Sequence, residues 1–327
     1  MNPGSHFAPP EASTIAPWVD GLLAYLTIAS FLTTLLVAAL VVVFLIRYRQ
    51  RPNRHARQIR GSLPLEIGWT IAPLIVMLTF FFAGASVYSR YQRPPQGAMD
   101  VYVVAKQWMW TLQHPQGPRE KDALHVPMGT PVRLIMTSED VVHSFFAPAF
   151  RIKQDVLPNR TTQTWFEATE PGRYRLYCAE YCGTSHSNMK GWITVMEPQE
   201  FQAWLEDAGQ GPSMAAAGEK LFQQLGCAQC HAGTCPPLGG LFGSSVPLED
   251  GSLVTADIDY LRNSILNPQA QIVAGYPPQM PTFKGQVTES ELQQLIAYIR
   301  SLSEQGAAGS SQAPPSGVRS DIEEGVR

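Results

Sequence analysis

Charged side chains are scarce in this chain. Asp, Glu, Lys and Arg together make up 16 % of its 327 residues, whereas soluble proteins average about 25 %. The net charge is −3, so no strongly basic surface is expected and nucleic acid is not a predicted partner. Cysteine is scarce too, and four of the five cysteines fall into two short motifs, which excludes a disulfide framework.

Two long stretches carry no charged side chain at all. They cover residues 21–46 and residues 67–89, and each exceeds the ~20 residues that a helix needs to cross a bilayer. A core helix of a soluble protein is rarely so long and so apolar on every face. A cleaved signal peptide is the alternative for the first stretch, but that stretch lacks a positive segment before it and is too long. Both stretches are therefore predicted to span a membrane.

Arginine is distributed unevenly around the two predicted spans. Residues 1–20 contain no Lys or Arg, whereas the connecting segment 47–66 contains six arginines. Positive residues are retained on the cytoplasmic side of a membrane, so segment 47–66 is predicted to be a cytoplasmic loop. Residues 1–20 and everything after Tyr91 then lie on the extracytoplasmic side.

Residues 94–206 have the pattern of an all-β domain. Runs of β-branched or alternating apolar residues occur at 99–104, 131–136 and 191–196. Turn residues separate these runs, as expected between strands. A short helix is predicted at residues 198–206, and the following residues 207–213 have the Gly, Pro and Ala content of a linker.

Residues 214–304 change to a helical pattern around a Gly- and Pro-rich middle. Ser213 is a candidate cap for the first helix of this region. Thr288 and Glu291 have the spacing of a capping box at the start of the last helix. The region is therefore predicted to be an all-α domain, and the Ala-, Gly-, Ser- and Pro-rich residues 305–327 are predicted to be disordered.

The motif Cys227-Ala-Gln-Cys230-His231 is typical of covalent haem attachment. Two thiols at this spacing form thioethers with the haem vinyl groups, and the adjacent imidazole becomes an axial ligand of the iron. A thioredoxin-like redox pair is the alternative, but the motif lacks a βαβ context and that reading leaves His231 unexplained. The sequence therefore predicts one covalent haem c.

Met280 is the candidate for the second axial ligand of the haem. It lies in a loop stiffened by Pro277, Pro278 and Pro281, and this loop and the final helix resemble those of class I cytochromes c. A thioether ligand raises the haem potential, as an electron carrier requires. The carbonyl of Pro236 is expected to orient the His231 ring, whereas Cys235 has no predicted role.

A second cluster of soft metal ligands lies upstream of the haem motif. Two thiols, an imidazole and a thioether fall within twelve residues, and a further imidazole precedes them; they belong to Cys178, Cys182, His186, Met189 and His143. Thiolate, thioether and imidazole together favour copper. Structural zinc is the alternative, but it prefers a closed set of four Cys or His and has no use for Met189. The second thiol allows two copper ions to share bridging sulfur atoms.

At these residues the chain resembles subunit II of haem–copper cytochrome c oxidases, whose motif C-x-E-x-C-G-x-x-H-x-x-M is matched at every position. The resemblance extends over the whole chain and implies a two-helix transmembrane hairpin, an all-β cupredoxin-like domain and the all-α class I cytochrome c domain of the caa-type branch. It implies a binuclear copper centre with side-chain ligands His143, Cys178, Cys182, His186 and Met189. Glu180 would add its backbone carbonyl, and its carboxylate would reach a Mg²⁺ or Mn²⁺ ion at the border with subunit I.

Two further residues resemble functional positions of this family. Trp108, in Gln107-Trp-Met-Trp110, matches the aromatic segment at which electrons enter, although a tryptophan in a strand is usually core packing. Glu66 matches the glutamate at the entrance of a proton path into subunit I, although a carboxylate at a helix start is otherwise an ordinary cap.

The resemblance implies the electron-input subunit of a proton-translocating terminal oxidase in a bacterial cytoplasmic (inner) membrane. Its expected partners are membrane lipid, subunit I, subunit III, and a donor such as cytochrome c or a quinol–cytochrome c reductase. One alternative is the electron-input subunit of a copper-dependent nitric oxide reductase. The other is a free-standing membrane electron carrier, although an anchor alone does not require two spans with Glu66 at the inner surface.

Overall fold

The computed structural model describes residues 9–52, 60–208 and 211–309, with side chains as far as Ser303. Most of the tail predicted to be disordered, at 310–327, lies outside the described residues, as does the centre of the arginine-rich loop at 53–59. The chain forms two compact units: the first contains two long helices and a β-sandwich, and the second is built mainly from residues 205 onward.

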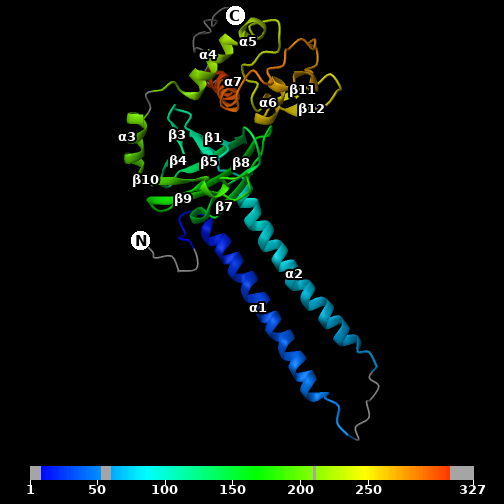
Figure 1. Cartoon of the computed structure of the whole chain (residues 1–327). Helices are drawn as coiled ribbons and strands as arrows, with labels where there is room; N and C mark the ends of the chain where they lie inside the picture. The colour runs from blue at the N-terminus through cyan, green and yellow to red at the C-terminus, as the bar shows by residue number, and fades with distance from the viewer. Residues whose placement is uncertain (1–8, 53–59, 209–210, 310–327) are drawn as a thin grey trace, which may run out of the picture. The chain divides into compact units, whose positions relative to one another are not determined.

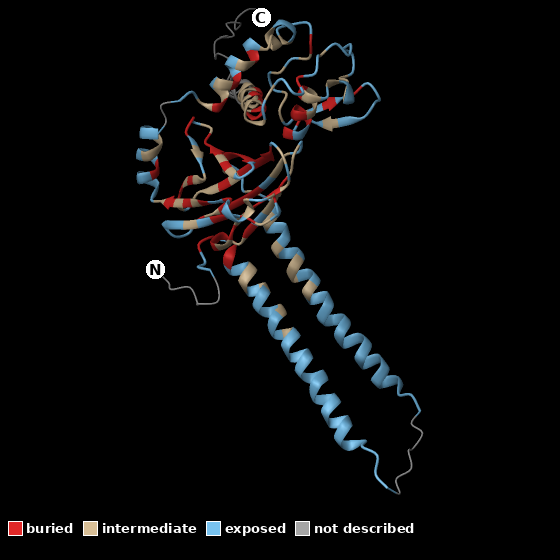
Figure 2. Ribbon diagram, in the orientation of Figure 1, coloured by how far each residue is buried: buried red, intermediate tan, exposed pale blue. Residues whose placement is uncertain are grey.

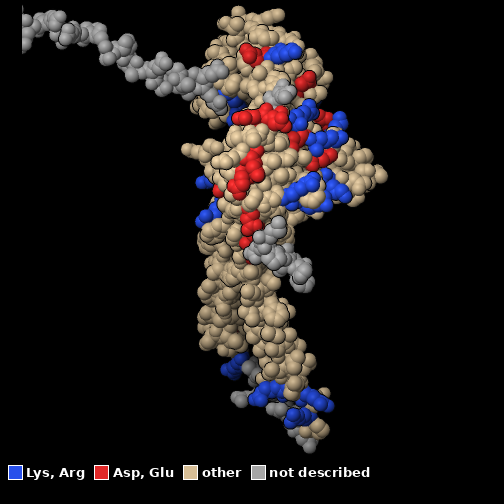
Figure 3. Space-filling view, turned by 90° about the vertical axis from the view of Figure 1, so that its left-hand side faces the viewer, with Lys and Arg blue, Asp and Glu red and all other residues tan. Residues whose placement is uncertain are grey.

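Two helices form an antiparallel hairpin in the first unit (Figure 1). Helix α1 spans Ala16–Arg47 and α2 spans Leu63–Gln92, so both extend beyond the charge-free stretches, and both are long and apolar enough to cross a membrane. Their side chains are largely exposed in the chain alone (Figure 2), and Figure 3 shows a surface without charge along the hairpin, with Lys and Arg at its far end. Surfaces of this kind are suited to lipid or to other membrane helices.

The β-sandwich consists of two five-stranded sheets. The strands are β1 (Met99–Lys106), β2 (Met109–Gln113), β3 (Arg119–Lys121), β4 (Ala123–Pro127), β5 (Pro131–Ser138), β6 (His143–Ala147), β7 (Ile152–Val156), β8 (Thr162–Glu167), β9 (Gly172–Cys178) and β10 (Lys190–Met196). One sheet has the order β3-β2-β1-β5-β8 and the other has the order β4-β10-β9-β6-β7. Alternate side chains of both sheets fill a shared core that includes Trp110, Phe145 and Phe166. Packing of two sheets over one core is the cupredoxin-like arrangement that the sequence predicts.

The segment before α1 is tied to the sandwich. The backbone N–H of Ala12 donates to the carbonyl of Ala149 at 2.9 Å, and Ala12 is fully buried. Arg151 makes a bidentate ion pair with Asp20 on α1, with both N–O distances 2.7 Å. A planar guanidinium fixes the orientation of a carboxylate as well as its position, so these contacts orient α1 against the sandwich. The sequence predicts only that this segment lies on the extracytoplasmic side.

The remaining elements follow the strands of the sandwich in the chain. They are α3 (Pro198–Ala208), α4 (Met214–Gln224), α5 (Cys227–His231), β11 (Ser245–Pro247), β12 (Leu253–Thr255), α6 (Ile258–Leu266) and α7 (Glu289–Gly309). Ser213 accepts a hydrogen bond from the N–H of Ala216 at 3.1 Å, and Thr288 and Glu291 form the predicted capping box. Helix α7 continues to Gly309, so the first residues of the segment predicted to be disordered are helical.

Helices α4 and α7 pack closely at one glycine. A Cβ atom added at Gly218 would clash with the carbonyl oxygen of Gln294 and with Cβ of Tyr298, both on α7. Phe222, one turn further along α4, lies 5.3 Å from the ring of Tyr298 between ring centroids. Glycine at this position therefore lets the two helix backbones approach.

We expect Gly218→Ala to destabilise the C-terminal domain by about 1–3 kcal/mol, because an inserted methyl group must push the two helices apart. Gly233→Ala is the matched control, since an added Cβ there meets no atom within 4 Å. Chemical denaturation of the full chain in detergent, followed by haem absorption and circular dichroism, measures the difference. Equal midpoints for the two variants would contradict the close packing.

Candidate metal and haem sites

The sandwich brings together the soft ligands that the sequence separates. His143 is the first residue of β6 and Cys178 is the last residue of β9. These strands are antiparallel neighbours with Phe145 opposite Cys178, so the two residues lie at the same end of the sheet. Cys182, His186 and Met189 follow in the loop that connects β9 to β10.

The donor atoms of this group converge on one small volume. The Sγ atom of Cys178 lies 3.8 Å from Cys182 Sγ, 4.0 Å from His143 Nδ1 and 3.2 Å from the carbonyl oxygen of Glu180. The Sγ atom of Cys182 lies 3.5 Å from His186 Nδ1 and 3.8 Å from Met189 Sδ. The Sδ atom of Met189 is also 3.1 Å from His143 Nδ1. All six residues proposed from the sequence are therefore neighbours here. The carboxylate of Glu180 belongs to an exposed residue.

The electrostatics of the two thiols differ sharply. Burial opposes ionisation of Cys178, but hydrogen bonds from His143 and from backbone groups outweigh it and lower the pKa of Cys178 to about 6. Burial and the neighbouring Cys178 thiolate raise the pKa of Cys182 to about 12. Two thiolates this close require nearby positive charge, as a metal supplies. A buried set of thiolate, imidazole and thioether donors fits copper.

Asp140 orients His143, and the sequence motifs do not predict this role. Its carboxylate lies 2.8 Å from His143 Nε2 and accepts the backbone N–H groups of Gln107 and Val141, each at 2.7 Å. Burial opposes its ionisation, but these hydrogen bonds lower the pKa of Asp140. With the Nε2 proton held by this carboxylate, Nδ1 faces the thiols as an acceptor, which is a common arrangement for metal-binding histidines.

Trp108 touches the ligand loop directly. Its indole Nε1 donates to the carbonyl oxygen of Cys182 at 3.1 Å, and the side-chain amide of Gln107 donates to the same oxygen at 2.8 Å. The Trp108 side chain is 36 % exposed, whereas Trp110 is fully buried in the core. Trp108 is therefore accessible to a partner and in contact with the ligand loop, which a core tryptophan is not.

Glu66 lies apart from these residues. It is in the first turn of α2, at the end of the hairpin that is distant from the sandwich (Figure 1). Its backbone N–H donates to the carbonyl of the N-cap residue Ser62 at 3.0 Å, which is the first i→i−4 hydrogen bond of α2. Its side chain is exposed.

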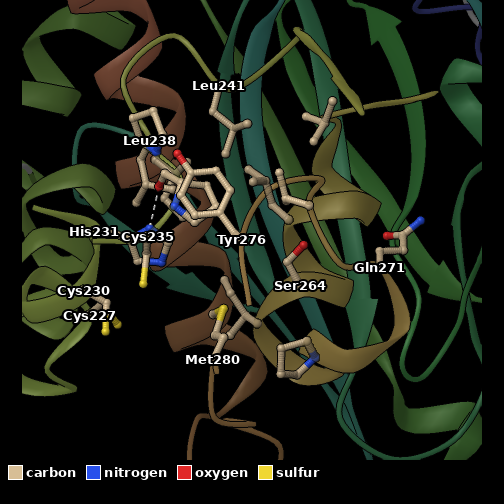
Figure 4. Close-up of a pocket in the computed structure, with 18 of the residues that line it drawn as sticks. Cys227, Cys230, His231, Cys235, Leu238, Leu241, Ser264, Gln271, Tyr276 and Met280 are labelled. Atoms are coloured by element: carbon tan, nitrogen blue, oxygen red, sulfur yellow. Dashed lines mark hydrogen bonds between the residues drawn. The ribbon is translucent and has the colours of Figure 1, made fainter. Parts of the chain in front are cut away.

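A cavity of about 680 Å³ collects the residues of the haem motif. Cys227, Cys230, His231 and Met280 all line it, and Figure 4 shows His231 and Met280 reaching into it from different segments. None of its lining residues is charged. The size and apolar lining are typical of a cofactor pocket, so the residues present fit a haem.

His231 is held in place by a backbone carbonyl. Its Nδ1 lies 2.8 Å from the carbonyl oxygen of Pro236, which confirms the expected orienting contact and leaves Nε2 free to face the cavity. Burial raises the pKa of Cys227, and the nearby thiol of Cys235 raises the pKa of Cys230. Cys235 itself is buried at the cavity wall.

Three family descriptions match successive parts of the chain. Residues 3–86 match the transmembrane domain of cytochrome c oxidase subunit II, residues 118–196 match the periplasmic domain of the same subunit, and residues 213–299 match cytochrome c oxidase, cbb3-type, subunit III. The last match covers the domain that carries the haem motif.

Individual relatives agree with these matches. Cytochrome c oxidase subunit 2 of Alkalihalophilus pseudofirmus is 30 % identical over 310 residues, which cover 88 % of each chain. The subunit 2 of Cereibacter sphaeroides is 28 % identical and covers 64 % of this chain and 82 % of its own. A crystal structure of the periplasmic domain of subunit II from Bradyrhizobium japonicum is 30 % identical, covers 36 % of this chain and 96 % of its own, and has a TM-score of 0.34. The chain belongs to the cytochrome c oxidase subunit II family and carries a cytochrome c domain after the copper domain.

Proposed function

We propose that this chain is the electron-input subunit of a caa-type terminal oxidase. A haem c and a copper pair, when bound, supply one-electron carriers between a donor and subunit I, where oxygen is reduced to water with proton translocation. The observation that carries the proposal is the convergence of six copper-type donors in one domain, in a chain whose other domain offers a haem cavity. The chain itself contributes electron transfer and not the oxygen chemistry.

The copper domain supplies a rigid and largely dry ligand set. Cys178, Cys182, His143 and His186 would hold two copper ions, with Met189 and the carbonyl of Glu180 as weaker donors, and the pair would supply a one-electron carrier. Because His143 and Met189 are almost fully buried, the donors move little when the charge of the centre changes. The exposed carboxylate of Glu180 is the proposed ligand for a Mg²⁺ or Mn²⁺ ion shared with subunit I.

The haem domain supplies attachment, orientation and exclusion of water. Cys227 and Cys230 would hold the haem covalently, and His231 and Met280 would ligate its iron. The Pro236 carbonyl fixes the ring of His231. Trp108, exposed and bonded to the ligand loop, is the proposed point at which electrons reach the copper domain. Subunit III and a cytochrome c or quinol–cytochrome c reductase donor are the remaining proposed partners in a bacterial cytoplasmic membrane.

Oxygen uptake by the purified complex tests this function. A complex that consumes oxygen with reduced cytochrome c supports the oxidase, and one that reduces nitric oxide but not oxygen supports the reductase. A chain that purifies without any catalytic partner supports a free-standing carrier.

Stopped-flow reduction is a second test of the function. The linker after α3 is only a few residues long, so haem and copper stay at roughly millimolar effective concentration. Reduction of copper should then be independent of protein concentration.

We expect Cys182→Ser to abolish the binuclear copper spectrum. An electron shared by two copper ions gives seven hyperfine lines in electron spin resonance, whereas one copper gives four. The wild-type chain should show two coppers and seven lines, and the variant should bind one copper or none. Cys235→Ser is the matched control. Because that thiol lies outside the copper cluster, the copper spectrum of this variant should match that of the wild type. A four-line wild-type spectrum would rule out the binuclear centre.

We expect Met280→Ala to remove the weak sulfur-to-iron absorption band in the red. The haem should stay attached through Cys227 and Cys230, and its potential should fall by on the order of 100 mV, within the roughly 0.8 V over which axial ligands tune haem. Lys284→Ala, an exposed change four residues after Met280 at a residue that does not line the cavity, is the control and should keep the band. Retention of the band in Met280→Ala would move the axial ligand to another residue.

We expect Glu66→Gln to slow steady-state oxygen reduction on the order of tenfold, because the amide cannot pass a proton inward as a positioned acid can. Reduction of the haem c and of the copper pair should be unchanged, and reduction of the oxygen-binding haem in subunit I should be affected most. Glu200→Gln, at an exposed position on α3, is the control. Wild-type turnover of Glu66→Gln at every pH would show that the residue is only a helix cap.

A further inference from the structure

The sheet with the order β4-β10-β9-β6-β7 is covered on only part of its outer face. Helix α3 lies over the β4 side, where the ring of Trp204 stacks on His125 with 4.7 Å between ring centroids and Phe201 is buried. Strand β9 is two strands away from β4 (Figure 1), and its outward side chains are exposed or half-buried. This part of the sheet is therefore available to a partner.

Basic and aromatic side chains make up the uncovered part. Alternate residues of β9 and β10, such as Leu176 and Ile193, are buried in the core, so the residues between them point outward. In the register of the two strands, Arg175 lies opposite Trp192. The outward residues that form this surface, called here the β9–β10 face, are Arg173, Arg175, Tyr177, Lys190 and Trp192.

Trp192 holds two guanidinium groups in place on this face. The Cζ atom of Arg175 is 3.6 Å from the centroid of the Trp192 ring, and that of Arg173 is 4.3 Å from it. A guanidinium over an aromatic ring is attracted to the ring through its flat side, and its N–H groups stay available at its edge. Such N–H groups bind carboxylates in a bidentate way. The two arginines are therefore prepared for anionic groups of a partner.

The positive charge of the β9–β10 face is not balanced by acidic side chains. Strands β9 and β10 contain no Asp or Glu. Among the residues that the structure describes, no carboxylate lies within ion-pair distance of Arg173, Arg175 or Lys190. Lys153 on the edge strand β7, by contrast, is paired with Asp155 at 2.8 Å. Exposed cations beside aromatic rings favour a protein surface that carries carboxylates.

The β9–β10 face adjoins the proposed copper site. Tyr177 directly precedes Cys178, and Lys190 directly follows Met189. The backbone N–H of Cys178 donates to the carbonyl of Met189 at 3.1 Å, so both pairs lie at the same end of the sheet. Because successive residues of a strand point to opposite sides, a partner on the outer side of Tyr177 is separated from the Cys178 thiol by the thickness of one strand.

We propose that the β9–β10 face docks an acidic redox protein, with Asp and Glu side chains around its redox group, as an external electron donor to the copper site. The inference rests on the proposed copper centre. One electron passes from the reduced donor to the copper pair, with no bond made or broken and no proton moved. This face is separate from Trp108, whose indole contacts the carbonyl of Cys182, so the chain offers a second entry surface for donors of acidic charge.

Two probes of opposite charge test the docking. Native cytochrome c is basic, and the same protein with succinylated lysines is acidic. Their binding to the full chain, purified with its partners in neutral detergent, would be measured by isothermal titration calorimetry. At low salt we expect the acidic probe to bind on the order of tenfold more tightly, and salt should reduce the difference by screening the charges. Equal affinity, or tighter binding of the native probe, would overturn the proposal.

Charge reversal locates the docking on this face. Arg175→Glu should weaken binding of the acidic probe on the order of tenfold, and Arg175→Gln should weaken it less, with the copper content of both variants unchanged. Lys121→Glu is the matched control, because it makes the same change at an exposed residue of β3 in the other sheet. Equal weakening by Arg175→Glu and Lys121→Glu would refute docking at the β9–β10 face.

Stopped-flow mixing with the reduced probes tests electron entry. Copper reduction, followed by near-infrared absorption, should show a bimolecular phase that is faster with the acidic probe and several-fold slower in Arg175→Glu. An acidic probe that binds but reduces copper no faster than the native probe would contradict the donor role. Oxygen uptake enters none of these measurements, so failure of the docking and failure of the proposed oxidase function are distinguishable.

Carbodiimide cross-linking separates a protein partner from membrane lipid. Lys190 is the only lysine of the β9–β10 face, and it should form an amide with a carboxylate of the acidic probe, which mass spectrometry locates. Protection of Lys190 from acetylation in phosphatidylglycerol nanodiscs, without a cross-link to the probe, would assign the face to anionic lipid and overturn the proposal.

Discussion

Two thiols held 3.8 Å apart in a buried site set the constraint on which the copper domain depends. Each would ionise to a negative thiolate when it binds a metal, and two such charges at this distance repel strongly where water is excluded. Burial and then the neighbouring Cys178 thiolate raise the pKa of Cys182 to about 12, whereas, despite burial, hydrogen bonds with His143 and the backbone lower the pKa of Cys178 to about 6. A site with both thiolates needs nearby positive charge, which a bound metal ion would supply.

The sandwich keeps this repulsive pair together. Cys178 ends β9, which is hydrogen-bonded to both β6 and β10, so its position follows from the register of three strands. His143 begins the neighbouring strand, and Asp140 fixes the direction of its ring through contacts to the backbone of the Trp108 segment and of its own turn. The same carboxylate therefore connects the histidine to the segment that carries the exposed tryptophan. The loop that bears Cys182 is bonded to that segment as well, through the carbonyl of Cys182.

The sequence predicts the ligand residues of both sites better than the residues that hold those ligands in place. Short motifs contain Cys178, Cys182 and the Cys227–His231 group, because their spacing is dictated by the metal and by the haem. His143 could be found by its type, but its proximity depends on strand pairing over 35 residues, which spacing alone does not reveal. The only sequence feature that points to Asp140 is its position three residues before His143. The ion pair of Arg151 with Asp20 joins segments 131 residues apart, and no local pattern of the sequence predicts it.

The two sites are stabilised in different ways. The proposed copper donors are positioned by sheet hydrogen bonds and a buried core. The haem residues lie instead on a five-residue helix, a turn and a proline-rich loop, and these surround a large apolar cavity. Cavity walls of this kind lose packing contacts unless the space is filled. Covalent attachment of the proposed haem would make the filling permanent, and the rigid prolines around Met280 would limit the entropy that its loop loses on binding. Tight strand pairing at one site and a permanently bound ligand at the other would therefore have the same result, which is donor atoms that stay in place during electron transfer.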